Sequence, residues 1–362
     1  MLSKTKIYID KDSLEIIAQD STLSDNYYKN IIEILRRHAE LYLDVTKEDL
    51  DFIRDPKDLN DPGDIYTFIE GKSLPWPSSA IENFVALHDK GKMPDIHANV
   101  VYILNNKEDV KNLRDKYGVM AIFIEDLNDD IFYYYCSPDI DMDAVPGSAA
   151  ENGWQCILRE ELGLLPPSNS IVVSDSNLLT NNKKDITGVN HFCGLVNLKD
   201  LLNLLLPQTI DIPYYVLIVC PNTSKFEEGK TKKLVSRWVD EVKALRTYSI
   251  VVEFILTQKT VHSRDLYTNY YQVHLDKGFY VFEPWTKKVH KDGESHNDIK
   301  IFSYLYSPFK RGKSEVDSAV VDLKVIHSKY EAFLRKTGES ILIDSSVNPN
   351  KQSDLSKNRI LF

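Results

Sequence analysis

Short apolar segments alternate with amphipathic segments along most of this sequence. Val100 to Leu104 is apolar throughout, as expected for a strand that is buried on both faces, and Lys107 to Tyr117 then carries apolar residues at helical spacing. Met120 to Ile124 is apolar again, and Gly118 before it is a residue type that commonly ends helices. This stretch therefore predicts a strand, a helix and a second strand in succession.

The same reasoning predicts the other elements. Strands are expected at Ile7–Ile9, Leu41–Leu43, Ser170–Ser174, Tyr214–Cys220 and Ser249–Leu256, with a strand pair at Thr260–Asn269 and Gln272–Leu275. Helices are expected at Asn26–Glu40, Ser78–His88, Trp154–Leu164, Asn197–Leu206, Lys232–Arg246 and Asp317–Arg335. Strands that alternate with helices at this pitch predict an α/β fold with mostly parallel or mixed sheets flanked by helices.

The length and one break in the pattern predict two domains. A chain of 362 residues exceeds what one hydrophobic core usually serves. Between Asp126 and Gly153 the alternation gives way to a stretch rich in Asp, Pro, Gly and Ala. We therefore expect an N-terminal α/β domain at 1–145, a second α/β domain at 146–345, and a C-terminal tail at 346–362 that is mostly solvated.

Charge and cysteine usage narrow the class of protein. The net charge of -10 argues against a protein coated in nucleic acid, although a local basic groove is compatible with it. The four cysteines form no C-x-x-C pair, which favours free thiols in a reducing compartment over a zinc site or a disulfide framework. The N-terminus lacks the pattern of a signal peptide, and the apolar run Tyr214 to Cys220 is far shorter than the ~20 residues of a membrane span. These features predict a cytoplasmic protein without a membrane span.

The segment that begins at His262 is the best candidate for chemistry. His262 and Arg264 are separated by one residue, so on a strand both side chains point to the same face, and Asn269 follows five residues later. An imidazole can attack phosphorus or move a proton, and a guanidinium can hold two phosphoryl oxygens. The pattern is suited to phosphodiester chemistry.

At these residues the chain resembles the phospholipase D superfamily, whose motif is H-x-K-x4-D on a strand that follows βαβ elements. His262-x-Arg264-x4-Asn269 is in register with that motif, and the similarity covers about Ser168 to Pro284. The resemblance implies that His262 is the nucleophile or the acid and base, that Arg264 holds phosphate in place of the lysine, and that Asn269 occupies the place of the aspartate. Superfamily active sites use two such motifs, so a chain with one motif implies a homodimer. The resemblance also implies that the reaction at His262 uses no cofactor.

Two departures from the motif bear on activity. Arg264 keeps the positive charge of the lysine and improves bidentate binding of phosphate. Asn269 lacks the carboxylate that could orient or charge the imidazole, which weakens a catalytic interpretation. The run from His262 to Phe279 also resembles uncharacterised bacterial proteins associated with anti-phage defence, and phospholipase D-like modules that have lost catalysis and bind lipids or partners.

Tyrosines and acidic residues supply further candidates. Tyr267 and Tyr270 could stack on nucleic acid bases beside the motif, although alternation along a sheet explains them equally well. In the first domain, Asp10 and Asp126 follow predicted strands at the edge where parallel sheets bind ligands, and could hold Mg²⁺ or Mn²⁺. A first strand that ends in Asp10 faintly resembles PIN-type nuclease domains, but strand-terminal aspartates are also common in turns and helix caps.

The leading hypothesis is a nuclease or nuclease-like phosphodiesterase that works as a homodimer, in which His262 acts on phosphorus and Arg264 holds the phosphoryl oxygens. Its alternative is a catalytically silent module that binds phosphate or a partner protein within a larger defence assembly. A half-buried ion-pair network of His262, Arg264 and Asp265 would explain the same residues without any chemistry.

Overall fold

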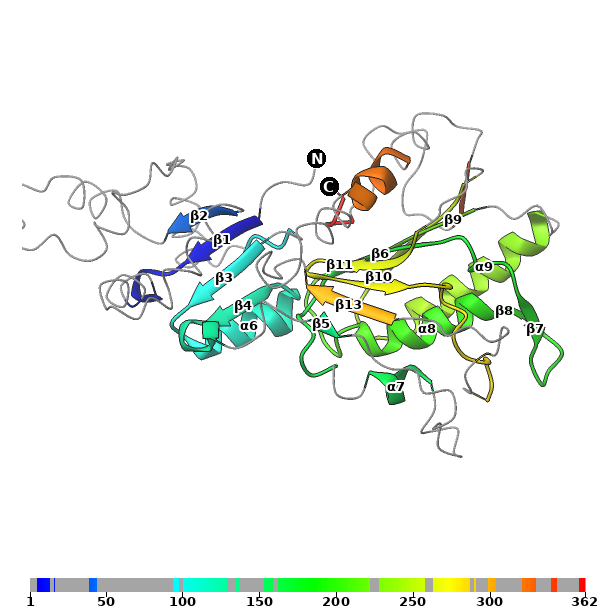
Figure 1. Cartoon of the computed structure of the whole chain (residues 1–362), viewed down its shortest axis with the longest axis horizontal. Helices are drawn as coiled ribbons and strands as arrows, with labels where there is room; N and C mark the ends of the chain where they lie inside the picture. The colour runs from blue at the N-terminus through cyan, green and yellow to red at the C-terminus, as the bar shows by residue number, and fades with distance from the viewer. Residues whose placement is uncertain are drawn as a thin grey trace, which may run out of the picture. The chain divides into compact units, whose positions relative to one another are not determined.

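The computed structural model describes residues 5–13, 16, 39–43, 94–97, 100–128, 135–136, 153–158, 162–221, 228–257, 263–286, 290, 299–303, 321–329, 340–343 and 358–361. The chain divides into two compact units, one formed mainly by residues 3–129 (the N-terminal unit) and one mainly by residues 130–362 (the C-terminal unit). Both contain a β-sheet with helices beside it, so the α/β fold class is confirmed (Figure 1).

The N-terminal unit contains a four-stranded sheet in the order β2-β1-β3-β4, in which every described pair is parallel. Its strands are β1 (Thr5–Ile9), β2 (Ala39–Leu43), β3 (Val100–Leu104) and β4 (Met120–Phe123), with α6 (Lys107–Tyr117) and the 3-10 helix η2 (Ile124–Asn128). β3 and β4 are buried along their whole length, as their unbroken apolar sequence predicts.

The C-terminal unit contains an eight-stranded mixed sheet in the order β14-β10-β9-β6-β11-β12-β13-β5. Three neighbouring strands, β6 (Ser170–Asp175), β9 (Tyr214–Pro221) and β10 (Ile250–Thr257), are parallel. An antiparallel series continues from β6 through β11 (Arg264–Thr268), β12 (Tyr271–Leu275) and β13 (Ile299–Ser303) to β5 (Tyr135–Cys136), and β14 (Ser340–Ile343) pairs antiparallel with β10 at the other edge.

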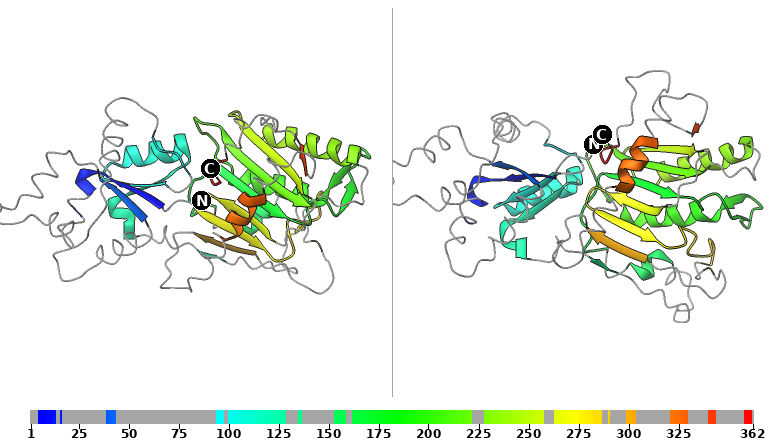
Figure 2. Two further views of the ribbon diagram at one scale, coloured as in Figure 1. Left: turned by 90° about the horizontal axis from the view of Figure 1, so that it is seen from above. Right: turned by 45° about the horizontal axis from the view of Figure 1, so that its top comes forward.

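Helices lie on both faces of this sheet (Figure 2). α8 (Cys193–Leu205) and α9 (Glu228–Lys243) pack on one face, where Trp238 of α9 meets Phe254 of β10 edge to face. The helical residues 321–329 lie on the other face, where the Tyr267 hydroxyl donates to the Asp322 carboxylate over 3.1 Å. A small sheet of β7 (Asn182–Lys184) and β8 (Asn190–Phe192), and the short α7 (Trp154–Ile157), complete the described elements.

Most predicted elements of the described chain are confirmed, with shifted ends. α6 matches its predicted bounds, β4 ends one residue early, and α8 begins four residues before the expected Asn197. The helix expected at Asn26–Glu40 cannot include its last two residues, because β2 begins at Ala39 and pairs with β1 there. The remainder of that helix, and the helix expected at Ser78–His88, lie outside the described residues.

The expectation of a mostly solvated C-terminal tail is wrong at its end. Asn358, Ile360 and Leu361 are buried, and the Asn358 amide donates to the Ile171 carbonyl of β6 over 2.9 Å. The Arg359 guanidinium donates to the Asn169 carbonyl over 3.2 Å. The last described residues therefore pack against the beginning of β6, where they donate hydrogen bonds to backbone carbonyl groups.

Candidate functional site

Arg264 stands at the start of β11, opposite Asp175 at the end of β6. The two residues are Cα partners in the antiparallel ladder, so their side chains lie on the same face of the sheet. Arg264 is half-buried, and its Nη1 donates to the Asp276 carbonyl oxygen. Its Nε is buried and has no hydrogen-bond acceptor among the described residues. His262 lies outside the described residues, so the expected histidine–arginine pair stays a prediction.

The Asp175 carboxylate holds the loop that follows β12. It is fully buried, and it accepts hydrogen bonds from the backbone N–H of Asn177 at 2.7 Å and of Phe279 at 2.9 Å. Burial raises the pKa of Asp175 to about 6, although both hydrogen bonds and the charge of Arg264 act in the opposite direction. A buried, ionised carboxylate and a half-buried guanidinium thus lie together at this corner of the sheet at neutral pH.

Two further hydrogen bonds tie the same corner together. The Asn177 amide donates to the Lys277 carbonyl over 3.1 Å, and the Ser263 hydroxyl donates to the Ser174 hydroxyl over 2.7 Å. The end of β6, the start of β11 and the loop after β12 therefore form one connected cluster around Arg264, which we call the Arg264 corner. Sequence reasoning missed Asp175, although an aspartate that directly follows a buried parallel strand is a signal for a ligand-facing edge.

The structure does not bring Asn269 to Arg264. Asn269 follows the last residue of β11, and five residues of extended chain span about 16 Å. Its side-chain oxygen accepts from the backbone N–H groups of Asn169 and Ser170, both at 3.0 Å, and its amide donates to the Asn169 side chain over 2.9 Å. Asn269 is buried and anchors the beginning of β6, so it cannot orient a group at the Arg264 corner.

The two candidate stacking tyrosines are buried as well. Tyr267 is 0% exposed and Tyr270 is 2% exposed. Tyr267 points to the face opposite Arg264, because its strand position differs from that of Arg264 by an odd number of residues. In this structure neither ring offers a face on which a nucleic acid base could stack.

The two candidate metal ligands of the N-terminal unit, Asp10 and Asp126, lie after strands that are not neighbours in the sheet. Asp10 follows β1 and accepts from the backbone N–H groups of Ser13 and Asn105, both at 2.8 Å, so its carboxylate links the ends of β1 and β3. Asp126 lies in η2 after β4, and β3 stands between β1 and β4, which places the two strand ends about 10 Å apart. Within the described residues no group of three metal-binding side chains occurs. A Mg²⁺ or Mn²⁺ site here stays a prediction.

Sequence reasoning also missed a histidine–aspartate pair on the other face of the C-terminal sheet. His274 of β12 is the Cα partner of Asp265 of β11, and its Nδ1 donates to the Asp265 carboxylate over 2.7 Å. Gln272 donates to the same oxygen over 2.7 Å. The hydrogen bond to Asp265 raises the pKa of His274. Asp265 therefore belongs to a network with His274 and Gln272, rather than to an ion pair with Arg264.

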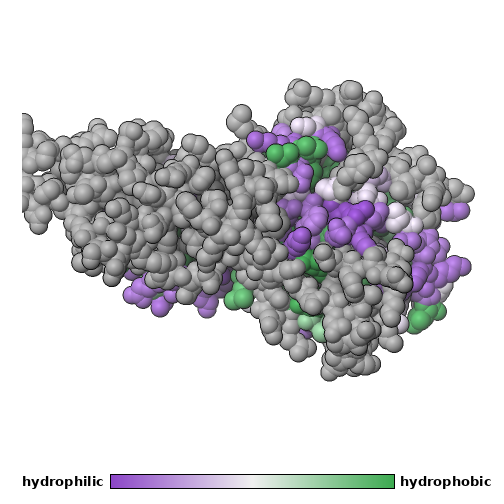
Figure 3. All heavy atoms as spheres, viewed as in Figure 1, coloured by the Kyte–Doolittle hydropathy of each residue, from purple (hydrophilic) through white to green (hydrophobic). Residues whose placement is uncertain are grey.

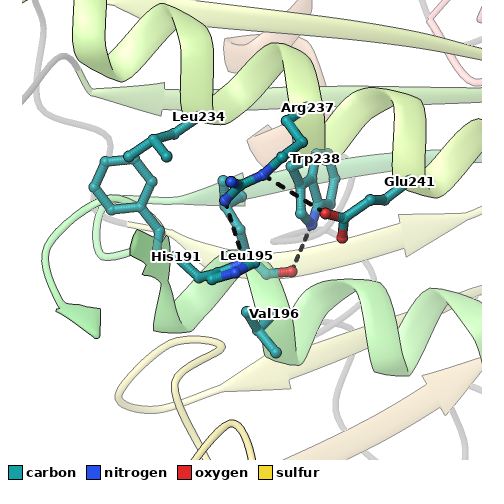
Figure 4. A pocket seen from close by; sticks show the side chains of 8 residues that line it. His191, Leu195, Val196, Leu234, Arg237, Trp238 and Glu241 are labelled. Atoms are coloured by element: carbon teal, nitrogen blue, oxygen red, sulfur yellow. Dashed lines mark hydrogen bonds and ion pairs between the residues drawn. The ribbon is translucent and has the colours of Figure 1, made fainter. Parts of the chain in front are cut away.

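A shallow pocket lies where β8, α8 and α9 meet (Figure 4). Arg237 of α9 lies between His191 and Glu241, with Nη2 3.3 Å from His191 Nδ1 and Nε 3.7 Å from the Glu241 carboxylate. Trp238 closes one side and donates to the Leu195 carbonyl over 2.6 Å. The pocket is thus lined by both apolar and charged side chains, and its charged groups already bind one another.

Comparisons with known proteins do not assign the chain to a family. No family model and no curated protein matches it. Among solved structures, the C-terminal lobe of a budding yeast Argonaute aligns with 84% of this chain and 69% of that chain, at 9% identity and a TM-score of 0.17. A TM-score of 0.17 is too low to indicate a shared fold. In the part of the chain that the structure describes, no helix is long and apolar enough to cross a bilayer.

Proposed function

We propose that the C-terminal unit is a binding module that recognises a phosphodiester at the Arg264 corner without cleaving it. The observation that carries this proposal is the position of Asn269, which is committed to the backbone of β6 at the far end of β11. The residue that would orient His262 in the phospholipase D-like motif is thus absent from the corner. Arg264 remains as the cation that could hold phosphoryl oxygens.

The surroundings of Arg264 support phosphate binding whose strength depends on the charge of Asp175. The side chain of Arg264 is only half-buried, and its one hydrogen bond among the described residues, from Nη1 to the Asp276 carbonyl oxygen, leaves other donors of the guanidinium for a ligand. At neutral pH the Asp175 carboxylate competes with an anionic ligand for the same cation. Since the pKa of Asp175 is about 6, protonation below that pH removes the competing charge. Binding of a phosphodiester, whose own charge is constant over this range, should strengthen as the pH falls from 7 to 5.

The setting of the proposal is a larger assembly in a reducing cytoplasm. Cys193 and Cys220 are buried free thiols, as expected for a protein that does not depend on disulfides. Bacterial anti-phage defence is the context that the sequence resemblance implies. In such an assembly the module would supply phosphate recognition, and other components would supply the chemistry.

The test measures binding of the full chain to a fluorescein-labelled single-stranded 20-nucleotide DNA by anisotropy. We expect Arg264→Lys to weaken binding about fivefold or more, because lysine cannot form the bidentate contact. Arg114→Lys on α6 is the matched control and should bind like the unchanged protein. Equal affinity of all three proteins, or no binding at pH 5, would contradict phosphate recognition at Arg264.

A second candidate function is the homodimeric phosphodiesterase, and Asp175 favours it. A buried carboxyl group with a pKa of about 6 can exchange a proton near neutral pH, which is what acid–base catalysis next to His262 would require. We expect this function to give cleavage of the labelled DNA in the presence of EDTA, loss of cleavage in His262→Ala, and a dimer on gel filtration. Binding without cleavage by a monomer would exclude it.

A further inference from the structure

His191 of β8 lies between two side chains of opposite charge. Its Nε2 is 2.9 Å from the Asp185 carboxylate, and its Nδ1 is 3.3 Å from Nη2 of Arg237 on α9. Figure 4 shows the second of these contacts beside the pocket. Since Asp185 lies in the turn between β7 and β8, the imidazole links this hairpin to helix α9.

The two neighbours determine which ring nitrogen carries the proton. A guanidinium nitrogen can only donate a hydrogen bond, so His191 Nδ1 must be the acceptor and carry no proton. An ionised carboxylate can only accept, so Nε2 must carry the ring proton and donate to Asp185. The arrangement therefore requires a neutral His191 with its proton on Nε2.

Asp185 keeps its negative charge in neutral and mildly acidic solution. Its carboxylate accepts from the Thr187 hydroxyl at 2.6 Å, and from the backbone N–H groups of Thr187 at 2.8 Å and of Val189 at 2.9 Å. These hydrogen bonds, above all the one from the Thr187 hydroxyl, lower the pKa of Asp185, and the bond from His191 acts in the same direction. A change of charge at the contact of Asp185 with His191 therefore comes from the histidine.

A second proton on His191 is incompatible with the Arg237 contact. Imidazole is the side chain that ordinarily gains or loses a proton between pH 5 and 8. In the imidazolium both ring nitrogens donate, so the Nδ1 proton would point at a donor nitrogen of like charge only 3.3 Å away. Because the hydrogen bond to Asp185 becomes stronger when the ring is charged, the ring stays with Asp185 and Arg237 must move.

The movement of Arg237 would break a second link between α9 and β8. The same Nη2 atom donates to the Asn190 carbonyl of β8 over 2.6 Å, so both contacts depend on one position of the guanidinium. Glu241 lies one turn further along α9, and its carboxylate is 3.7 Å from Arg237 Nε. Arg237 thus has a second partner on its own helix.

The other charged groups around His191 belong to residue types that ordinarily keep their charge between pH 5 and 8. They are Lys183 of β7, which binds Glu283 at 2.5 Å, Lys199 of α8, which binds Glu241 at 2.5 Å, and Lys233 of α9. His191 is therefore the group in this cluster whose charge responds to pH in that range. Its side chain is 20% exposed, and hydrophilic surface stands beside hydrophobic surface at this end of the unit (Figure 3), so water can exchange protons with the ring.

We propose that His191 is a pH sensor: when it is protonated, Arg237 leaves β8 for Glu241, and helix α9 is uncoupled from the β7–β8 hairpin. The contact of His191 with Arg237 exists above the pH at which the ring gains its second proton, and it is lost below that pH. This inference concerns a part of the C-terminal unit other than the Arg264 corner and does not depend on the proposed function.

The experiment is a double-mutant cycle of His191→Ala and Arg237→Ala, measured by urea unfolding of the full chain at pH 8 and at pH 5. At pH 8 we expect the interaction of the two side chains to favour the folded state by about threefold in the unfolding equilibrium constant. At pH 5 the interaction should vanish or become unfavourable. The cycle of Arg246→Ala and Asn203→Ala is the matched control, because there a guanidinium donates over 2.7 Å to an amide oxygen that does not titrate. It should give the same coupling at both pH values.

Two further measurements separate the proton from the loss of the ring. In His191→Asn the amide oxygen can take the place of Nδ1 as an acceptor that does not titrate, so Arg237→Ala in that background should cost the same at pH 8 and at pH 5. The coupling of Arg237 with Glu241 in the unchanged background should be stronger at pH 5 than at pH 8.

NMR of the histidine ring nitrogens in the full chain gives a readout without variants that weaken the fold. At pH 8 we expect the His191 proton on Nε2, and a proton on Nδ1 instead would overturn the proposal. Equal coupling of His191 with Arg237 at the two pH values would overturn it as well. If His191→Asn keeps the pH dependence of the coupling, another group is the sensor and the proposal is wrong.

Discussion

Gly278 lies against the carboxylate of Asp175 so closely that no side chain fits between them. A Cβ at position 278 would stand 2.8 Å from Asp175 Oδ2 and 3.0 Å from Asp175 Oδ1. The backbone of Gly278 has a φ of 92°, a conformation that L side chains rarely adopt. Because Asp175 is itself fixed by two backbone hydrogen bonds, the carboxylate cannot move away without breaking them.

We therefore expect Gly278→Ala to lower the free energy of unfolding by about 3 kcal/mol, from backbone strain together with the clash. Gly188→Ala is the control, since Gly188 has a φ of 81° but nothing within 4 Å of an added Cβ. It should lose only the strain, about 1 kcal/mol. Urea unfolding followed by tryptophan fluorescence measures both. Equal losses of unfolding free energy in the two variants would show that the contact with Asp175 does not contribute to stability.

Asp175 should make stability depend on pH between about 4 and 6. Its folded pKa of about 6 lies above the ordinary aspartate value of 3.8, so the folded state binds the proton more tightly than the unfolded state. The carboxyl group thus contributes stability at low pH that is lost as the pH rises through this range, by about 3 kcal/mol in total. Asp175→Asn should lack this slope when free energies of unfolding are compared at pH 4, 5 and 6. Parallel pH profiles for both proteins would refute the assignment.

Restoring the aspartate of the motif should not create an enzyme. In Asn269→Asp the carboxylate would still accept from the N–H groups of Asn169 and Ser170, but it would place an oxygen against the Asn169 side-chain oxygen. We expect a loss of about 2 kcal/mol of stability and no gain in DNA cleavage. Asn169→Ala in the same background should recover part of the stability. A rise in cleavage on Asn269→Asp would contradict the separation of Asn269 from the Arg264 corner.

The C-terminal residues should stabilise the sheet. Ile360 is 4% exposed, and we expect Ile360→Ala to lower the free energy of unfolding by about 2–4 kcal/mol. The matched control is Ile186→Ala, where the same atoms are removed from a side chain that is 99% exposed, with an expected change within about 0.5 kcal/mol. Chemical denaturation of both variants gives the comparison. Similar small effects at the two positions would show that residues 358–361 do not pack as described.

Local pattern was sufficient for the elements whose burial is uniform. β3 is apolar and buried along its whole length, the middle of β6 is the apolar run Ile171–Val173, and α6 carries its buried Val110 and Leu113 on one face. The same pattern failed for the β7–β8 hairpin, because β7 is polar and exposed throughout and β8 has only three residues, of which only Phe192 is buried. That hairpin is fixed by the hydrogen bonds of Asp185 and by packing against α8 and α9, neither of which hydrophobic periodicity records.

At the candidate site, too, some features follow from the sequence and others only from the tertiary structure. The sequence by itself determined that Arg264 lies on a strand and that this strand belongs to an α/β fold, because backbone preferences and hydrophobic spacing act over a few neighbouring residues. Only the tertiary structure decided that Asp175 meets Arg264 and Gly278 while Asn269 lies at the other end of β11. Strand order and register bring together residues about a hundred positions apart, and they depend on how whole elements pack rather than on any local run of residues.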